Sequence, residues 1–311
     1  MAQIRPKPVN RSSRLQRMIR NRYLYAMLLP VLIYFAVFSY TPMYGTIIAF
    51  KNFNPFLGIM RSEWVGFKYF VQFFESVYFS RLISNTLTIS LLSIALGFPM
   101  PILLALMMNE LKSARYKRIV QTAVYLPHFV SVVVVAGMIL SFLSVRSGVV
   151  NAFIRQLGGT PISFMSTPGY FPFIYAISGV WQEAGWGSII YLAAIAGIDP
   201  GLHEAAVIDG ASRFQRLLHV TLPCILPTII IMFILRMGSV FTVGFEKVML
   251  LYNTRIYETA DVISTYVYRR GIQGMEFSFS TAVGLFNSAI NLVVLVTFNQ
   301  ISKRVGETSL W

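Results

Sequence analysis

The chain has 311 residues, of which 56% are hydrophobic and 12% are charged, whereas about 25% of the residues of a soluble domain are charged. This composition excludes an ordinary soluble protein. The net charge of +14 fits basic loops that contact anionic lipid head groups. The basic run at 5–22 lacks the aromatic side chains that stack on bases, so no nucleic-acid partner is predicted. The single cysteine, Cys224, excludes an intrachain disulfide.

Charged residues are absent from four long stretches of the chain. Each is longer than the ~20 residues that a helix needs to cross a bilayer. Two further apolar stretches, about 172–198 and 223–250, each carry a charge near the middle. We therefore predict an all-α membrane protein with six transmembrane helices, because the strands of a β-barrel would be shorter and alternating. The four stretches without charge are 23–50, 82–109, 119–145 and 277–302.

The distribution of Lys and Arg predicts the orientation. With the amino terminus inside the cell, the cytoplasmic segments carry fifteen of these residues and the outer segments ten, as the positive-inside rule requires. Both termini and a polar insert at 199–222 are therefore expected in the cytoplasm. The first span is expected to be an uncleaved anchor, because it is longer than a signal-peptide core and lacks a small-residue cleavage site. The division that follows is a basic amino terminus at 1–22, a membrane domain at 23–302 and a tail at 303–311.

Two charged residues fall near the middle of predicted spans, Glu183 in the fourth and Arg236 in the fifth. A charge at the centre of a bilayer costs about 2.5–3.5 kcal/mol on insertion scales, so each residue is expected to face a partner or a wet cavity. Two interpretations are open. Either Glu183 and Arg236 form an ion pair between neighbouring helices, or Arg236 faces a cavity and meets the substrate.

Polar and small side chains follow helical spacing along the fourth and sixth predicted spans. Such a face either packs helices together, as Gly, Ser and Asn do in bilayers, or lines a pathway. In the second span, Pro99 and Pro101 predict a kink, because each removes a helix hydrogen bond. The candidate pathway residues are Tyr175, Trp181, Glu183, Trp186, Arg236, Asn287 and Asn291.

The insert between the fourth and fifth predicted spans is polar and helix-forming. Asp199, followed by proline, predicts an N-cap and a helix over about 201–208. Gly210 permits a turn, and Ser212-x-x-Gln215 matches a capping box. The capping box predicts a second short helix, separate from the next span. A loop that only connects two spans needs no such elbow, so we expect a partner on the aqueous side to hold it.

The elbow contains the sequence E-A-A-x-x-D-G-A at 204–211, with nine residues between its glycine and a V-x-L-P sequence at 220–223. This pattern resembles the E-A-A motif of permease subunits of bacterial ABC importers, with Val220 where isoleucine is more usual. His203 stands where many of these proteins have tyrosine. The resemblance covers essentially the whole chain and extends to the carbohydrate-uptake branch, in particular its oligosaccharide and polysaccharide permeases. The further stretches that carry it are 181–200, 258–270 and 307–311.

The resemblance implies the type I ABC importer permease fold and a coupling role for the elbow. The elbow would dock in a cleft on a separate ATPase subunit, where Glu204 would make a charge-assisted bond. ATP binding would then flip the bundle from inward-open to outward-open. The alternative is an amphipathic helix that rests on lipid, which would not need Gly210 and two acids. The expected coupling residues are Glu204, Ala205, Ala206, Asp209, Gly210 and Ala211.

The chain carries no G-x-x-x-x-G-K-[ST] phosphate loop. We therefore expect no enzyme and no cofactor in this chain, with ATP and Mg²⁺ bound by a partner. The resemblance implies two ATPase subunits, a second homologous permease that forms a heterodimer, and an extracytoplasmic sugar-binding protein. The assembly would lie in the bacterial inner membrane, in contact with lipid.

Two other classes of function compete with this interpretation. An ion-gradient-driven secondary transporter would need a carboxylate in the membrane, and Glu183 is the candidate. A membrane enzyme would need a catalytic or metal site, but the three histidines lack the H-E-x-x-H spacing, so no metal site is predicted. These histidines are His128, His203 and His219.

The substrate is the least specified part of the prediction. The outer segments carry ten basic and six acidic residues, which together with Arg236 favours an anionic sugar chain. Aromatic rings such as Tyr175, Trp181 and Trp186 could stack on sugar faces, although aromatic residues also sit at membrane interfaces for packing. By resemblance, uronate oligosaccharides such as alginate or oligogalacturonide are candidate cargoes, as are neutral fragments of plant polysaccharides.

Overall fold

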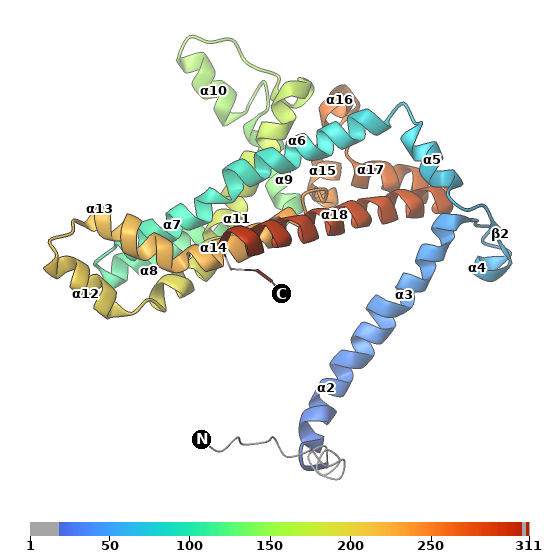
Figure 1. Cartoon of the computed structure of the whole chain (residues 1–311). Coiled ribbons are helices and arrows are strands. Elements are labelled where there is room, and N and C mark those ends of the chain that lie inside the picture. The colour runs from blue at the N-terminus through green and yellow to red at the C-terminus, as the bar shows by residue number, and fades with distance from the viewer. Residues whose placement is uncertain (1–18, 307–308, 311) are drawn as a thin grey trace.

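The computed structural model describes residues 19–306, 309 and 310. The predicted basic amino terminus and the end of the carboxyl-terminal tail lie mostly outside these residues. The described chain is a bundle of helices, with one helical rod that stands apart from it (Figure 1). The cytoplasmic elbow predicted at 199–222 forms one end of the bundle, and the segment around α5 forms the opposite end.

The first predicted span is the rod that stands apart. It consists of α2 (Arg22–Phe35), a π-type turn (Ala36–Tyr40), α3 (Thr41–Met43) and a 3-10 segment (Tyr44–Phe50). Together they make 29 helical residues, and none of the most apolar window is buried. Only the last segment of the rod packs on the bundle, against α18.

A short segment, predicted to lie outside the cell, connects the rod to the bundle. It holds a two-stranded antiparallel sheet, in which Lys51 pairs with Trp64 and Asn52 with Glu63. The rings of Phe50 and Trp64 stack beside this sheet, with centroids 5.7 Å apart. The elements of the segment are β1 (Lys51–Asn52), α4 (Gly58–Arg61), β2 (Glu63–Trp64) and α5 (Lys68–Phe74).

Helix α11 (Phe171–Ala196) lies at the centre of the bundle and packs against α6, α7, α8 and α14. Gly185 allows the close approach of α11 to α8, because a Cβ atom at this position would clash with the carbonyl group of Val124. The other long helices are α6 (Phe79–Gly97), α7 (Pro99–Asn109), α14 (Leu222–Met237) and α18 (Phe277–Gly306). Helices α6 and α7 form one run that is interrupted at Phe98, where Pro99 predicts a break.

The prediction of one uninterrupted span over 119–145 is wrong. The structure has α8 (Ala114–Tyr125), a 3-10 turn (Leu126–Phe129) and α9 (Val132–Phe142), and the two helices meet at an angle of 97°. Pro127 lacks the N–H group that would continue α8. Ser131 then starts a new helix, since its side chain accepts a hydrogen bond from the backbone N–H of Val134.

The prediction of a separate second elbow helix is also wrong. Helix α13 (Arg213–Arg216), a π-type turn (Leu217–Thr221) and α14 form one continuous helix of 25 residues. The π-type turn accommodates Pro223, which cannot make the regular helix hydrogen bond. The fifth span therefore begins inside the elbow. It ends at Met237, earlier than predicted, and a turn leads to α15 (Phe245–Leu251).

Within the described residues, four helical runs are long and apolar enough to cross a membrane, and five if the bent pair α8–α9 counts as one. Helix α11 has 26 residues, a length of about 39 Å at 1.5 Å per residue. Its sequence is less apolar because Gln182 and Glu183 lie in its middle. The count of six spans and the cytoplasmic position of the termini remain predictions.

The connections predicted to lie on the outer side are short helices and turns, and a buried ion pair joins the segment after α16 to the end of α17. Asp261 is fully buried, and Arg269 donates two hydrogen bonds of 2.8 Å to its carboxylate. These bonds raise the pKa of Arg269 above its ordinary value. Arg81 of α6 lies 3.4 Å from the same carboxylate. The elements are α10 (Val149–Gln156), α16 (Tyr257–Ala260), α17 (Ile263–Tyr268), 3-10 turns (Phe164–Ser166, Pro168–Tyr170, Thr254–Ile256) and a π-type turn (Arg269–Gln273).

Candidate functional site

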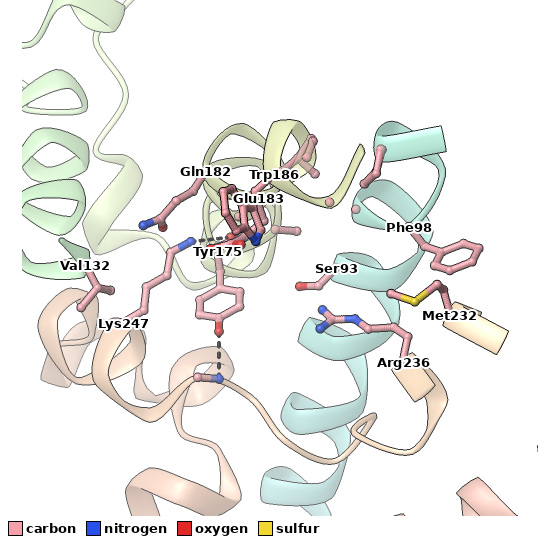
Figure 2. A pocket seen from close by; sticks show the side chains of 18 of the residues that line it. Ser93, Phe98, Val132, Tyr175, Gln182, Glu183, Trp186, Met232, Arg236 and Lys247 are labelled. Carbon is pink, nitrogen blue, oxygen red and sulfur yellow. Dashed lines mark hydrogen bonds between the residues drawn. The ribbon is translucent and has the colours of Figure 1, made fainter. Parts of the chain in front are cut away.

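A cavity of about 670 Å³ opens beside the middle of α11. Its walls come from α6, α7, α11, the end of α14 and the start of α15 (Figure 2). Its volume lies within the range of about 300–1,000 Å³ that is common for small-molecule sites. Four of the seven candidate pathway residues line it: Tyr175, Glu183, Trp186 and Arg236.

Tyr175 joins α11 to the segment that follows α14. Its hydroxyl oxygen accepts a hydrogen bond of 2.9 Å from the backbone N–H of Gly244. Its backbone carbonyl accepts a hydrogen bond of 3.1 Å from Lys247 Nζ. A Cβ atom at Gly244 would lie only 2.8 Å from the Tyr175 hydroxyl oxygen, so a larger residue would displace the end of the tyrosine side chain. The two bonds fix α15 against the cavity.

Glu183 pairs with a residue that the sequence did not suggest. Its carboxylate lies 3.0 Å from His128 Nδ1, in the turn between α8 and α9. The predicted ion pair between Glu183 and Arg236 is therefore not formed. The other interpretation, in which Arg236 faces a cavity, agrees with the structure.

Arg236 lies in the last turn of α14, where the helix dipole favours a cation. Within the described part of the chain, its guanidinium group makes no hydrogen bond or ion pair. Figure 2 shows this side chain reaching into the open space opposite Tyr175. The site thus presents a planar group of five hydrogen-bond donors that has no acceptor among the described residues.

A stacked pair of rings holds the bend between α8 and α9 against α11. The His128 and Trp186 rings are nearly parallel, with centroids 4.6 Å apart and an angle of 4°. Phe129 meets the same indole edge-on, at 5.6 Å. In addition, Gln182 Nε2 donates a hydrogen bond of 3.0 Å to the carbonyl oxygen of Val130. One face of Trp186 is therefore occupied by the protein itself.

The cavity is lined by charges of both signs. The acidic residues are Glu183, held by His128, and Glu246, an exposed residue in the first turn of α15. The basic residues are Arg236, which is exposed to the cavity, and Lys247, which is only 8% exposed. The two acids are thus either engaged or in contact with solvent, whereas Lys247 is a buried cation.

Three candidate pathway residues do not line the cavity. Trp181 is 46% exposed, and Asn287 is partly buried in α18. Asn291 holds the segment after α14, because its Oδ1 accepts a bond of 3.0 Å from the N–H of Phe241 and its Nδ2 donates to Thr242 Oγ1 at 3.1 Å. This part of the polar face of α18 therefore packs helices together.

Two residues of the site, His128 and Lys247, are not among the pathway residues that the sequence predicts. A signal for Lys247 existed, since the charged pair Glu246-Lys247 interrupts the end of an otherwise apolar stretch. His128 was considered only as a metal ligand. Among the described residues, no group of three or more His, Cys, Asp or Glu side chains is placed to hold a metal ion.

The elbow has the local structure that its sequence predicts. Asp199 Oδ1 accepts a hydrogen bond of 2.9 Å from the N–H of Gly201 at the start of α12 (Pro200–Ile208). Gly210 has a φ angle of +77°, a conformation that favours glycine. Ser212 and Gln215 form both bonds of the capping box. The N-cap, the turn and the capping box are confirmed.

Most of the elbow is exposed. Glu204, Ala205, Asp209 and Gly210 are exposed, while Ala206 and Ala211 are partly buried. Large apolar side chains lie among them, and Ile208 is 85% exposed and Phe214 69% exposed. In the described residues Glu204 makes no ion pair. The end of the bundle thus exposes acidic and apolar side chains.

Comparison with known proteins agrees with this geometry. Residues 97–307 match the family described as binding-protein-dependent transport system inner membrane component. The chain is similar to the polygalacturonan/rhamnogalacturonan transport system permease protein YteP of Bacillus subtilis (strain 168), with 44% identity over 305 residues that cover 98% of this chain and 95% of the relative.

Two solved structures are similar over nearly the whole chain. One is a bacterial ABC transporter involved in the import of the acidic polysaccharide alginate, with 49% identity and a TM-score of 0.86, covering 94% of this chain and 99% of that chain. The other is a bacterial alginate ABC transporter in complex with an alginate pentasaccharide-bound periplasmic protein, with 48% identity and a TM-score of 0.87, covering 95% and 99%.

Proposed function

Because the chain belongs to the family of binding-protein-dependent transport system inner membrane components, we propose that its cavity is part of a path for acidic oligosaccharides and that an ATPase drives its elbow. The chain is a membrane-embedded permease subunit of an ABC importer in the inner membrane, and it is not itself an enzyme. A separate subunit hydrolyses ATP, and a binding protein brings the substrate. The comparisons do not favour a transporter driven by an ion gradient.

The observation that carries the proposed substrate class is the unpaired guanidinium group of Arg236 in the cavity wall. Arginine binds carboxylates through two parallel hydrogen bonds, which are stronger than bonds between neutral groups. Glu183 does not compete for Arg236, since its carboxylate is held by His128. A sugar carboxylate would therefore meet a group with free donors.

The similar proteins support the same substrate class. One is named for the transport of polygalacturonan and rhamnogalacturonan, and another takes part in the import of an acidic polysaccharide. We assign acidic oligosaccharides to this chain as well. Tyr175 and Trp186 supply aromatic surface in the cavity that Arg236 also lines, as sugar sites commonly require apolar walls with a few polar groups.

The elbow is proposed to dock in the ATPase subunit. The exposed carboxylate of Glu204 is available for a charge-assisted bond, and the small residues beside it permit close approach. The second part of the elbow, α13, continues into α14 as one helix. A displacement of the elbow would therefore move Arg236, which lies at the other end of that helix. Motion of the ATPase subunits would in this way change the cavity and alternate its access.

We also propose the membrane topology and the partner subunits that the sequence predicts. The termini and the insert at 199–222 lie in the cytoplasm, and 23–302 form six spans. Two ATPase subunits hold ATP and Mg²⁺, and a second homologous permease completes the pathway. Permease subunits of ABC importers bind no cofactor themselves.

Uptake by the complete importer in proteoliposomes tests the proposed function. We expect ATP-dependent uptake of trigalacturonate delivered by the binding protein, and weaker uptake of the same trisaccharide after its carboxyl groups are reduced to alcohols. Equal uptake of the two sugars would overturn the acidic substrate class. Uptake that persists without ATP and stops when an ion gradient is collapsed would overturn the importer mechanism.

A further inference from the structure

Lys247 is a buried cation that makes no direct ion pair within the described residues, and the carboxylate of Glu183 acts on it only at longer range. Its side chain lines the cavity and is 8% exposed. An ammonium group has three N–H donors, and a single hydrogen bond, to the carbonyl oxygen of Tyr175, is formed. No carboxylate of the described residues lies within 4.0 Å of Nζ. Because burial of an unpaired charge is costly, this position favours a ligand that brings a negative charge.

The chain holds Lys247 in place through contacts on two helices. Gly244, at the start of α15, is bound to the Tyr175 hydroxyl group. The ammonium group lies over the Tyr175 ring, 4.7 Å from its centroid. On α11, Gly179 lies beside the ammonium group, and a Cβ atom at this position would be in ordinary contact with Nζ at 3.8 Å. The ammonium group is therefore positioned by the fold before any ligand arrives.

Lys247 and Arg236 approach the cavity from different walls. Lys247 comes from α15 and Arg236 from the end of α14, and Figure 2 shows them on either side of Tyr175. Two cations that are separated in this way suit a ligand with two separated negative charges.

We propose that Lys247 is a second carboxylate-binding residue of the cavity, which acts with Arg236 so that the permease favours oligosaccharides with acid groups on more than one sugar. This inference rests on the proposed function, because it assumes that acidic sugars enter this cavity. It adds a requirement for charge spacing that Arg236 alone does not impose.

A purely structural role for Lys247 makes a different prediction. In that case the ammonium group only fastens α15 to α11 through the Tyr175 carbonyl. Loss of the residue would then weaken the uptake of every substrate to the same extent. A comparison of sugars with different numbers of acid groups therefore separates recognition from packing.

The test uses three trisaccharides and the complete importer in proteoliposomes. The sugars are trigalacturonate, a trisaccharide with one galacturonate, and the fully carboxyl-reduced trisaccharide. Lys247→Met removes the charge and retains an unbranched side chain. Lys247→Arg retains the charge. Lys303→Met is the matched control, because it removes an exposed lysine at the end of α18, away from the cavity.

For Lys247→Met we expect the uptake of trigalacturonate, relative to the carboxyl-reduced sugar, to fall about tenfold, the change that accompanies about 1.4 kcal/mol of lost binding. The sugar with one acid should lose less, since Arg236 still binds it. Lys247→Arg should keep most of the preference, and Lys303→Met should keep all of it.

An equal loss for all three sugars in Lys247→Met, with the preference unchanged, would overturn the role in recognition. If Lys247→Met fails to assemble, Lys247→Arg decides. Loss of the preference for multiple acids in Lys247→Arg, without a change in uptake of the neutral sugar, would contradict the proposal. A wild-type importer without any preference for acidic sugars would instead overturn the proposed function itself.

Discussion

The imidazole of His128 stacks on the indole of Trp186 at a centroid distance of 4.6 Å. His128 lies in the turn between α8 and α9, and Trp186 lies in α11. The same histidine contacts Glu183, one helical turn before Trp186. The bent helix pair is thus fastened to the central helix at its bend, directly beside the cavity.

We expect His128→Ala to destabilise the bend. The substitution removes an aromatic contact worth about 0.5–1.5 kcal/mol and leaves Glu183 without its partner. The apparent melting temperature of the purified permease complex in detergent should fall. His128→Phe should recover part of the loss, because it keeps a ring on Trp186. Equal melting temperatures for His128→Ala and wild type would contradict this role.

Gly185 is required for the contact between α11 and α8. A methyl group there would clash with the carbonyl of Val124, and overpacking costs about 1–3 kcal/mol. Gly185→Ala should therefore lower the thermal stability of the complex. Gly137→Ala is the control, since a Cβ atom at Gly137 has no heavy atom within 4 Å. The packing described here is incorrect if both variants behave alike.

The buried pair of Asp261 and Arg269 stabilises the outer connections. Removal of one partner from a buried ion pair costs about 3–5 kcal/mol, and Asp261 is fully buried. Asp261→Asn should reduce the yield and the melting temperature of the complex. Glu63→Gln removes an exposed acid in β2 and should have little effect. A stable Asp261→Asn variant would show that the connections are held by other contacts.

Glu204→Lys should uncouple transport from ATP hydrolysis. The substitution reverses an exposed charge on α12, so the protein should still insert in the membrane. We expect the loss of ATP hydrolysis that is stimulated by the loaded binding protein. Glu110→Lys reverses another exposed acid, directly after α7, and should keep this stimulation. Normal stimulated hydrolysis in Glu204→Lys would rule out the docking role of Glu204.

The elbow could be predicted because its signals are local. The Asp199 cap, the turn at Gly210 and the Ser212–Gln215 box each depend on residues within a few positions of one another. The continuity of α13 with α14 is not predicted, because Pro223 suggests the start of a helix. The π-type turn before Pro223 lets the helix continue.

The broken third span was missed for a different reason. The absence of charge from 119–145 favours one span, and it outweighed the local signals of Pro127 and Ser131, which end one helix and start the next. The contacts within the cavity could not be predicted from the sequence, because they depend on the tertiary structure. Neither the partner of Glu183 nor the position of Lys247 against Tyr175 follows from spacing along the chain, since each contact joins segments more than 50 residues apart.

Arg236 is proposed to select acidic oligosaccharides in the cavity. The most direct measurement is the ratio of trigalacturonate uptake to uptake of its carboxyl-reduced form, in proteoliposomes with the complete importer, for wild type and Arg236→Ala. A hydrogen bond to a charged group contributes about 1.5–3 kcal/mol, so the ratio should fall by at least about tenfold. Arg236→Lys should fall between the two. An unchanged ratio in Arg236→Ala, with both sugars taken up equally less well, would contradict the account.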